Sequence, residues 1–219
     1  TNGDGNSTGP TNQEWGEIFI GSGGKAEITH AQFKYPTRAV EVSGGTLTAK
    51  NITVQDAQTA IMTSPNDAPE VTNLVTTRVQ NAGILITGGQ INHDLTWGKG
   101  DAVLIIQRDI TVTPTASLTI EPGAILKFST YRAASYTSYG PTRNVDLRID
   151  GSLIVNGTEE QPVIFTSILD DTVGGDTNGD GNSTGPTNQE WGEISFGLGS
   201  TAVMGEYDIR YAMAPPVFP

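Results

Sequence analysis

The feature that most constrains this chain is a long internal repeat. Residues 1–18 and residues 177–194 are identical, and both read TNGDGNSTGPTNQEWGEI. The match weakens after this block, but apolar and aromatic positions still coincide, with Tyr35 matching Tyr211 for example. A unit of 176 residues therefore begins again at Thr177. We expect the chain to be a slice through a tandem array, or a fragment of a protein with two such units.

A shorter period lies within the unit. The segments 26–45, 46–65 and 70–89 each contain alternating apolar runs, of which the last read RAVEV, TAIMT and AGILI and start near residues 38, 59 and 82. Alternation with a period of two is typical of β-strands. A repeat of about 20–25 residues with three short strands suits one coil of a parallel β-helix, because such a coil buries its inner face only against its neighbours. The sequence therefore predicts an all-β fold, a parallel β-helix or solenoid.

The second half of the chain follows the same pattern, with two interruptions. Residues 110–129 and 147–167 align with each other, so that Leu118 matches Leu153. The segment between them is too polar to continue the pattern, and the segment 168–190 is rich in Gly, Asp, Asn and Pro. Such compositions disfavour regular structure. We expect both segments to be loops extruded from the coils.

The alternation also predicts which side chains form the core. In each run, alternate residues face inward, and the alternation decides which member of a close apolar pair does so. The candidate core positions are Val40, Val42, Ile61, Leu85, Ile86, Leu118, Ile120, Leu153, Val155, Ile164 and Phe165.

Composition narrows the classes of protein to which the chain can belong. The 219 residues carry a net charge of −12, which opposes binding to nucleic acid phosphates. No segment reaches the ~18 consecutive apolar residues of a membrane span. The chain has no cysteine, which a long repetitive extracellular domain tolerates better than a small one. We therefore expect no nucleic-acid partner and no membrane span in this segment.

Several stretches together resemble the right-handed parallel β-helix repeats of bacterial surface and secreted proteins. They are ITVTPTASLTIEPGAILKF, GSLIVNGTEEQPVIFTS, the Gly/Asp/Asn-rich loop and WGEISF, which occur here in that order. A unit in that family typically opens with a Trp, and Trp97 matches that position. The resemblance implies that residues 1–96 are the second part of one unit and that residues 97–219 begin the next, as one continuous solenoid. It also implies an extracellular or cell-surface location and a structural or adhesive role of the adhesin type.

One stretch suggests a metal site. The sequence DTNGDG (176–181) has oxygen-bearing side chains at alternate positions, from Asp176, Asn178 and Asp180, followed by a glycine. Hard oxygen ligands and a glycine that permits a sharp turn open the calcium loops of EF-hands. The twelfth position, however, is Thr187 rather than glutamate, so the segment is not an EF-hand.

A calcium site without helices would need further ligands. The carbonyl of Asn182 and the side chains of Asp170, Asp171 and Glu190 could supply them. The first copy of the repeated block retains two of the candidate ligands, Asn2 and Asp4. The alternative is an Asx-rich loop that is closed by its own hydrogen bonds, and the sequence leaves both possibilities open.

A second candidate site lies in the first predicted loop. Tyrosine rings next to arginine side chains can stack on a sugar ring and donate hydrogen bonds to it. The alternative is a surface loop that packs on itself. The candidate residues are Tyr131, Arg132, Tyr136, Tyr139 and Arg143.

Catalytic motifs do not stand out in the sequence. We find no nucleophile elbow, no phosphate-binding loop and no pair of histidines with metal-ligand spacing. Polysaccharide lyases with a parallel β-helix place a basic residue beside a calcium-binding aspartate cluster, and nothing in the sequence forces an arginine near Asp176. We therefore predict no catalytic residue.

The sequence thus favours a structural or adhesive extracellular repeat module that forms a stiff rod or fibre, with Ca²⁺ as a candidate stabilising ion. Its expected partners are further copies of itself, stacked end to end, and extracellular glycans. The alternative is a carbohydrate-active β-helix, a polysaccharide lyase or epimerase, or a glycan-binding module. A lyase would need Asp and Arg or Lys side chains that converge in one groove, whereas a rod would not.

Overall fold

The structure is a computed structural model, and it describes residues 8–11, 13–131, 143–216 and 218. These residues form β-strands joined by turns, and none of them lies in an α-helix. The described part of the chain accordingly holds no helix that is long and apolar enough to cross a membrane. The all-β class that the alternating apolar runs predict is confirmed.

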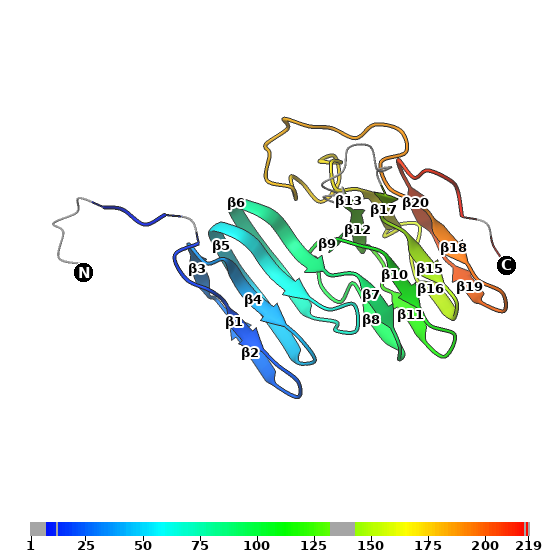
Figure 1. Cartoon of the computed structure of the whole chain (residues 1–219), viewed down its shortest axis with the longest axis horizontal. Helices are drawn as coiled ribbons and strands as arrows, with labels where there is room; N and C mark the ends of the chain where they lie inside the picture. The colour runs from blue at the N-terminus through cyan, green and yellow to red at the C-terminus, as the bar shows by residue number, and fades with distance from the viewer. Residues whose placement is uncertain (1–7, 12, 132–142, 217, 219) are drawn as a thin grey trace, which may run out of the picture.

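The strands form three parallel sheets, and the largest of them runs along the whole length of the molecule (Figure 1). We call the largest, which has ten strands, the long sheet. Its strands are β1 (Ile18–Ile20), β2 (Lys25–Thr29), β3 (Gln32–Lys34), β4 (Arg38–Val42), β5 (Thr46–Thr63), β6 (Glu70–Ile86), β9 (Leu104–Ile106), β12 (Ile125–Phe128), β17 (Val163–Ser167) and β20 (Tyr207–Ile209).

Two smaller sheets of four strands each complete the second half of the molecule. The second sheet contains β7 (Gly89–Ile91), β10 (Ile110–Val112), β15 (Leu147–Ile149) and β18 (Ile194–Phe196). The third sheet contains β8 (Leu95–Trp97), β11 (Ser117–Ile120), β16 (Ser152–Val155) and β19 (Thr201–Met204).

Successive strands stack in chain order, and every strand pair within these three sheets is parallel. One coil comprises three strands, such as β10, β11 and β12, and each strand pairs with its counterpart in the next coil. The long strand β5 forms a whole coil by itself. Its residues 46–50 pair with β2, residues 53–55 with β3 and residues 59–63 with β4. This arrangement is consistent with a parallel β-helix.

The strand register confirms the spacings that the sequence predicts. Arg38 lies opposite Thr59, and Leu118 lies opposite Leu153. Between Thr59 and Ile61 the register shifts by a β-bulge, which inserts an extra residue into one strand of a pair. The bulge accounts for one of the two residues by which the second predicted spacing, 23, exceeds the first, 21, because Thr48 of β5 already lies opposite Glu70 of β6, 22 residues later.

The inward-facing side chains form one continuous hydrophobic core. Every predicted core position except two belongs to it. Ile164 is partly exposed, because its neighbours Val163 and Phe165 point inward. Leu85 is buried on the outer face of the long sheet instead, where it packs with Ile105. In each of the two close pairs, Leu85–Ile86 and Ile164–Phe165, only the second residue faces the core.

A row of residues with left-handed backbone conformation forms one bend of the first coils. His30, Asn51 and Asn73 have φ values of 54° to 56°, which asparagine tolerates better than most residues. Their side chains join in a ladder, with Asn51 Nδ2 3.0 Å from His30 Nε2 and Asn73 Nδ2 donating to Asn51 Oδ1 at 2.8 Å. Asp101 extends the ladder by accepting a hydrogen bond from the Asn73 amide. The ladder joins successive coils at this bend.

Both copies of the repeated block end in the same turn. The indole Nε1 of Trp15 donates to the carbonyl of Lys34 at 2.8 Å, and that of Trp191 donates to the carbonyl of Arg210 at 2.7 Å. Trp191 is fully buried and stacks on Phe128 with ring centroids 4.2 Å apart, whereas Trp15 is 38% exposed. The turn is therefore a local product of the sequence, and the burial of its indole depends on the neighbouring coil.

We predict that Trp191→Ala destabilises the protein far more than Trp15→Ala. Removal of a fully buried large aromatic side chain costs about 3–5 kcal/mol, whereas Trp15 already contacts solvent. Urea denaturation followed by far-ultraviolet circular dichroism measures the difference. Equal losses of stability in the two variants would contradict the assignment of Trp191 to the core.

Candidate functional site

The segment after β17 is a loop without strands or helices between two coils, as its composition predicts, but the sequence does not indicate where this loop packs. It folds back along the molecule, so that the Ala82 amide of β6 donates to the carbonyl of Thr177 at 3.0 Å. The approach is close enough that a Cβ at Gly179 would lie 2.4 Å from the carbonyl oxygen of Val79. Figure 1 shows this segment (yellow to orange) arching over the upper end of the coils. We call residues 168–193 the strap.

Lys127 anchors the strap to the outer face of the long sheet. It lies on β12 with its side chain directed away from the core, and the strap buries it completely. Its Nζ donates to the carbonyl of Gly175 at 2.6 Å. Burial lowers the pKa of the ammonium group, and the carboxylates of Asp171, Asp170 and Asp176 oppose that shift. The strap therefore brings both a buried cation and several acidic groups to one place.

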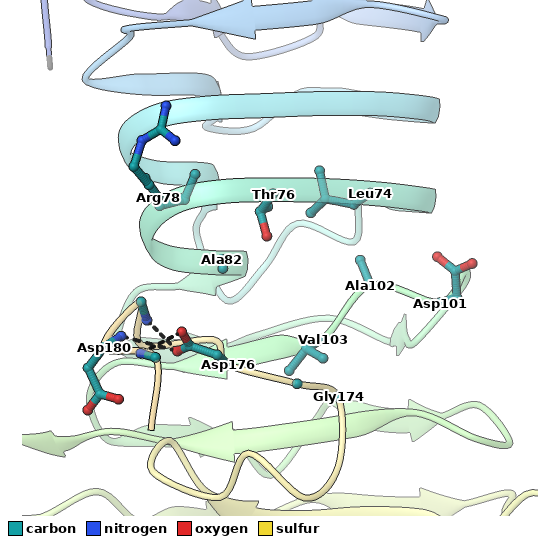
Figure 2. Close-up of a pocket in the computed structure, with 14 residues that line it drawn as sticks. Leu74, Thr76, Arg78, Ala82, Asp101, Ala102, Val103, Gly174, Asp176 and Asp180 are labelled. Atoms are coloured by element: carbon teal, nitrogen blue, oxygen red, sulfur yellow. Dashed lines mark hydrogen bonds between the residues drawn. The ribbon is translucent and has the colours of Figure 1, made fainter. Parts of the chain in front are cut away.

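Three aspartates of the strap lie together. Asp171, Asp176 and Asp180 each offer a carboxylate oxygen, and these oxygens all lie within 4.8 Å of one another. The amides of Gly179 and Gly181 donate to the Asp176 carboxylate at 2.7 and 2.8 Å, as Figure 2 shows. These are the hydrogen bonds of an Asx-rich loop, which the sequence offered as the alternative to a metal site. The same loop nevertheless gathers the three carboxylates.

Asp171 differs from the other two aspartates. Its Oδ1 is buried and has no hydrogen-bond partner among the described residues. Burial raises the pKa of this carboxyl, the charge of Asp176 raises it further, and the Lys127 ammonium acts in the opposite direction. A buried charged oxygen without a partner is unfavourable. The donor set of hard oxygen atoms fits a divalent cation such as Ca²⁺ or Mg²⁺ without distinguishing between them.

Other predicted ligands have partners within the loop. Asn178 Nδ2 donates to the Asp180 carboxylate at 3.0 Å, and the amide of Asn182 donates to it at 3.1 Å. Glu190 accepts a hydrogen bond from the Thr187 amide at 3.1 Å and does not belong to the aspartate group. The structure thus gathers three of the predicted ligands and leaves Glu190 apart.

The glycan-binding prediction is not resolved by the described residues. Tyr131 pairs with Arg143 in the short antiparallel ladder of β13 (Thr130–Tyr131) and β14 (Arg143–Asn144), which closes the base of the first loop. The predicted site residues that lie outside the described residues are Asn2, Asp4, Arg132, Tyr136 and Tyr139.

A groove of about 680 Å³ lies between the strap and β6. Its lining includes Asp176 and Asp180 from the strap, Asp101 from the turn before β9, and Arg78 from β6. Figure 2 shows the strap aspartates on one side of the groove and β6 on the other. Arg78 thus lines the same groove as Asp176, although nothing in the sequence forces an arginine near that aspartate.

The position of Arg78 follows from a second row of left-handed residues. Tyr35, Asp56 and Arg78 form the next bend of successive coils, with φ values of 62°, 55° and 54°. Arg78 Nε and Nη2 donate to the two carboxylate oxygens of Asp56 at 2.5 and 2.7 Å. These bonds lower the pKa of the Asp56 carboxyl and raise the pKa of the guanidinium. Arg78 is therefore directed toward β5 and away from Asp176, as Figure 2 shows.

The sequence predicts the partner of Arg78 but not the burial of Lys127. Arg78 stands 22 residues after Asp56, which is one coil, so their pairing could have been deduced from the period. Lys127 is a charged residue in an apolar run at an outward position, where an exposed lysine is the ordinary expectation. No local feature of the sequence indicates that a distant segment covers it.

We predict that Lys127→Met loosens the strap without unfolding the coils. Methionine fills the space but cannot donate to the Gly175 carbonyl or balance the aspartates, so amides such as those of Gly179 and Gly181 should exchange faster. Hydrogen–deuterium exchange measures this change, with the exposed Lys25→Met as the matched control. Unchanged exchange in the strap would show that Lys127 does not hold it.

Comparisons of this chain with protein-family models, with curated proteins and with solved structures found no significant match. Functional inference therefore depends on the geometry of the chain itself.

Proposed function

We propose that the chain is a structural or adhesive repeat module of an extracellular or cell-surface protein, in which successive units form a stiff acidic rod. The proposed fold of the rod is a right-handed parallel β-helix, because parallel crossovers within one sheet are right-handed in about 98% of cases. The observation that carries the proposal is the turn that recurs at Trp15 and Trp191 with the same hydrogen bond. Because the turn that begins the second unit has the same hydrogen bond as the turn that begins the first, units can follow one another without a change of fold.

The length of the unit sets the dimensions of such a rod. From β1 to β17, the described sheet strands provide six coils of three rungs and one further rung, with β5 and β6 contributing three rungs each. Adjacent strands lie ~4.8 Å apart, so each unit adds about 30 Å of rod. The further rung turns each unit by a third of a coil relative to the last, since β1 lies in the long sheet and its copy β18 in the second sheet.

A protein with two units tests the rod directly. We predict that fusing residues 1–176 to the N-terminus of the present chain lengthens the molecule by about 30 Å and leaves its cross-section unchanged. Small-angle X-ray scattering measures both quantities. A wider cross-section at constant length, or the scattering of two bodies on a flexible linker, would rule out the rod.

A divalent cation, with Ca²⁺ as the first candidate, would stabilise the strap in this proposal. Two observations support it: the carboxylate oxygens of Asp171, Asp176 and Asp180 lie within 4.8 Å of one another, and the buried Oδ1 of Asp171 has no partner among the described residues. A bound cation would supply the missing partner and reduce the repulsion among the three carboxylates. It would act on stability rather than on chemistry.

We predict that Ca²⁺ raises the melting temperature of the protein, because an ion that binds only the folded strap stabilises it by mass action. Asp171→Asn should abolish this increase. Calorimetric melting with Ca²⁺ and with a chelator measures both effects, and Glu159→Gln, an exposed charge outside the strap, is the control. A melting temperature that does not respond to Ca²⁺ would refute the calcium proposal.

We predict that Asp171→Asn stabilises the protein when divalent ions are absent. Because the pKa of Asp171 is raised by folding, its charge opposes folding once the pH rises through that pKa. Asp171→Asn should therefore melt at a higher temperature than the native chain at neutral pH. The gain should disappear at acidic pH, where the native carboxyl is protonated.

The groove gives some support to the second candidate, a carbohydrate-active or glycan-binding β-helix. Aspartates and Arg78 line it together, as a polysaccharide lyase or epimerase would require. The bidentate ion pair with Asp56 weighs against catalysis, because the guanidinium would have to leave Asp56 to reach a substrate. Oligosaccharide binding that is lost in Arg78→Ala, measured by isothermal titration calorimetry, would favour this candidate over the rod.

A further inference from the structure

One column of paired rungs stops in the middle of the described solenoid. β3 pairs with the middle of β5, and the middle of β5 pairs with residues 75–77 of β6. No described strand of the next coil pairs with that part of β6. The next coil bypasses it, since Gly100 bridges to Val71 and the chain soon returns to β6, where the Val103 carbonyl accepts a hydrogen bond from the Ile84 amide. Because coils lie on both sides of this rung, the gap is internal to the unit.

The hydrogen bonds of β5 show how its backbone groups are directed. The Thr53 amide donates to the Ala31 carbonyl at 2.9 Å. The Gln55 carbonyl accepts from the Tyr35 amide at 3.0 Å. Both residues of β5 therefore direct their backbone groups toward the preceding coil. In a parallel sheet the backbone groups of alternate residues point to opposite neighbouring strands, so those of Val54 point toward β6.

The same alternation places free backbone groups in the gap. Thr76 lies opposite Val54, with Val75 and Thr77 on either side of it. A residue that faces its neighbouring strand bonds to the two residues flanking its opposite number, so Val75 and Thr77 face β5. Thr76 therefore directs its amide and carbonyl away from β5. Among the described residues, neither group has a hydrogen-bond partner on that side.

The edge of β6 is paired on both sides of this open stretch, residues 74–77, which we call the open edge. Before it, Asp101 Oδ1 accepts a hydrogen bond from the Asn73 amide at 2.8 Å. After it, the Thr177 carbonyl of the strap accepts one from the Ala82 amide at 3.0 Å. A side chain and the strap thus take the place of the missing rung at its two ends. The room left between them is an extended stretch of ~13 Å.

The inner side chains of the open edge also lack the cover that the preceding rung has. Ile52 and Val54 of β5 are 2% and 0% exposed. Leu74 and Thr76 lie opposite them on β6 and are only half-buried. A further rung on the open edge would cover these two side chains as β6 covers those of β5.

The groove along the open edge combines an apolar part with acidic ends. Leu74 and Ala102 line it, and both pack against the core. Asp101 lies toward one end, and Asp176 and Asp180 lie on the strap at the other, as Figure 2 shows. The volume of about 680 Å³ falls within the ~300–1,000 Å³ of ordinary ligand pockets.

The cation of the groove does not balance these acids. Arg78 is the one cationic side chain among the described lining residues, and both oxygens of the Asp56 carboxylate bind its guanidinium. The carboxylates at the two ends of the groove therefore favour a ligand with positive charges at both of its ends.

We infer that the open edge binds an extended basic peptide as one additional parallel rung. Apolar side chains of the peptide cover Leu74 and Thr76, and a lysine or arginine at each end meets the carboxylates of Asp101 and of the strap. In strand addition of this kind, main-chain hydrogen bonds supply affinity and side-chain contacts supply specificity. The inference goes beyond the proposed rod and does not depend on it.

A synthetic peptide tests the inference. We predict that acetyl-KVTVTK-amide, whose valines are placed opposite Leu74 and Thr76, binds saturably and that acetyl-EVTVTE-amide does not. Isothermal titration calorimetry measures the affinity. Hydrogen exchange followed by nuclear magnetic resonance locates the site, because the Thr76 amide should become protected when the peptide binds.

A variant of the chain tests the acidic end. Asp101→Asn keeps an acceptor for the Asn73 amide but removes the charge, so the affinity for the lysine peptide should fall about threefold, as for one exposed ion pair. Glu159→Gln, which removes an exposed charge away from the groove, is the control.

Two N-methylated peptides separate backbone pairing from side-chain binding. In the proposed register the fifth residue lies opposite Thr77 and donates its amide to the Thr76 carbonyl, whereas the fourth directs its amide away from β6. N-methylation of the fifth residue should weaken binding about tenfold through the lost hydrogen bond. N-methylation of the fourth, the matched control, should leave the affinity nearly unchanged.

The inference is overturned by the absence of saturable binding, by equal affinities of the two N-methylated peptides, by equal or tighter binding of the acidic peptide, or by an affinity that Asp101→Asn does not lower. Oligosaccharide binding in the groove without peptide binding would overturn it in favour of the second candidate function. The length of a two-unit protein bears on the rod alone, so the inference and the proposed function can fail separately.

Discussion

Parallel backbone pairing between successive coils is the interaction on which the rest of the structure depends. A single coil is too thin to bury its inner face, so pairing with the next coil and formation of the core are one event. The long sheet shows this most directly, because one apolar column passes through all of its coils. Successive members of the column lie opposite each other in the paired strands. They are Ile18, Val40, Ile61, Ile84, Leu104, Leu126, Phe165 and Ile209.

The strap is part of this framework and not an appendage. Its docking buries the Lys127 ammonium on the outer face of the long sheet and brings Asp171, Asp176 and Asp180 to the same region. A buried ammonium is costly unless anionic or carbonyl oxygens surround it, and the Gly175 carbonyl and the nearby carboxylates meet that need. The acidic loop therefore already has a structural reason for its charges. A divalent cation would add to this arrangement at the buried Oδ1 of Asp171, which has no partner among the described residues.

The proposed rod is compatible with the groove that the structure shows. Repeated coils need only edges that pair, and the described strands at both ends supply them. The groove arises where the strap crosses β6, so each strap in an array would create one. Because the unit ends one rung later than a whole number of coils, successive grooves would face different directions around the rod. An adhesive role would use that distribution, since a ligand could meet a groove from any side.

The sequence by itself determined the all-β class, the spacing of the strands, their order and most of the core. These follow from alternation and from a period of about 21 residues, which are local properties that parallel stacking converts directly into register. It also located the three aspartates, because their spacing within one short loop is local. Only the tertiary structure decided that the strap folds back onto β6, that Lys127 is buried beneath it, and that Arg78 shares a groove with Asp176. Each of these contacts joins segments whose separation in sequence corresponds neither to the coil period nor to the 176-residue unit. No repeat pattern in the sequence therefore predicts them. The clearest case is the repeated block, where identical residues leave Trp15 exposed and Trp191 buried, because burial belongs to the neighbouring coil and not to the residue.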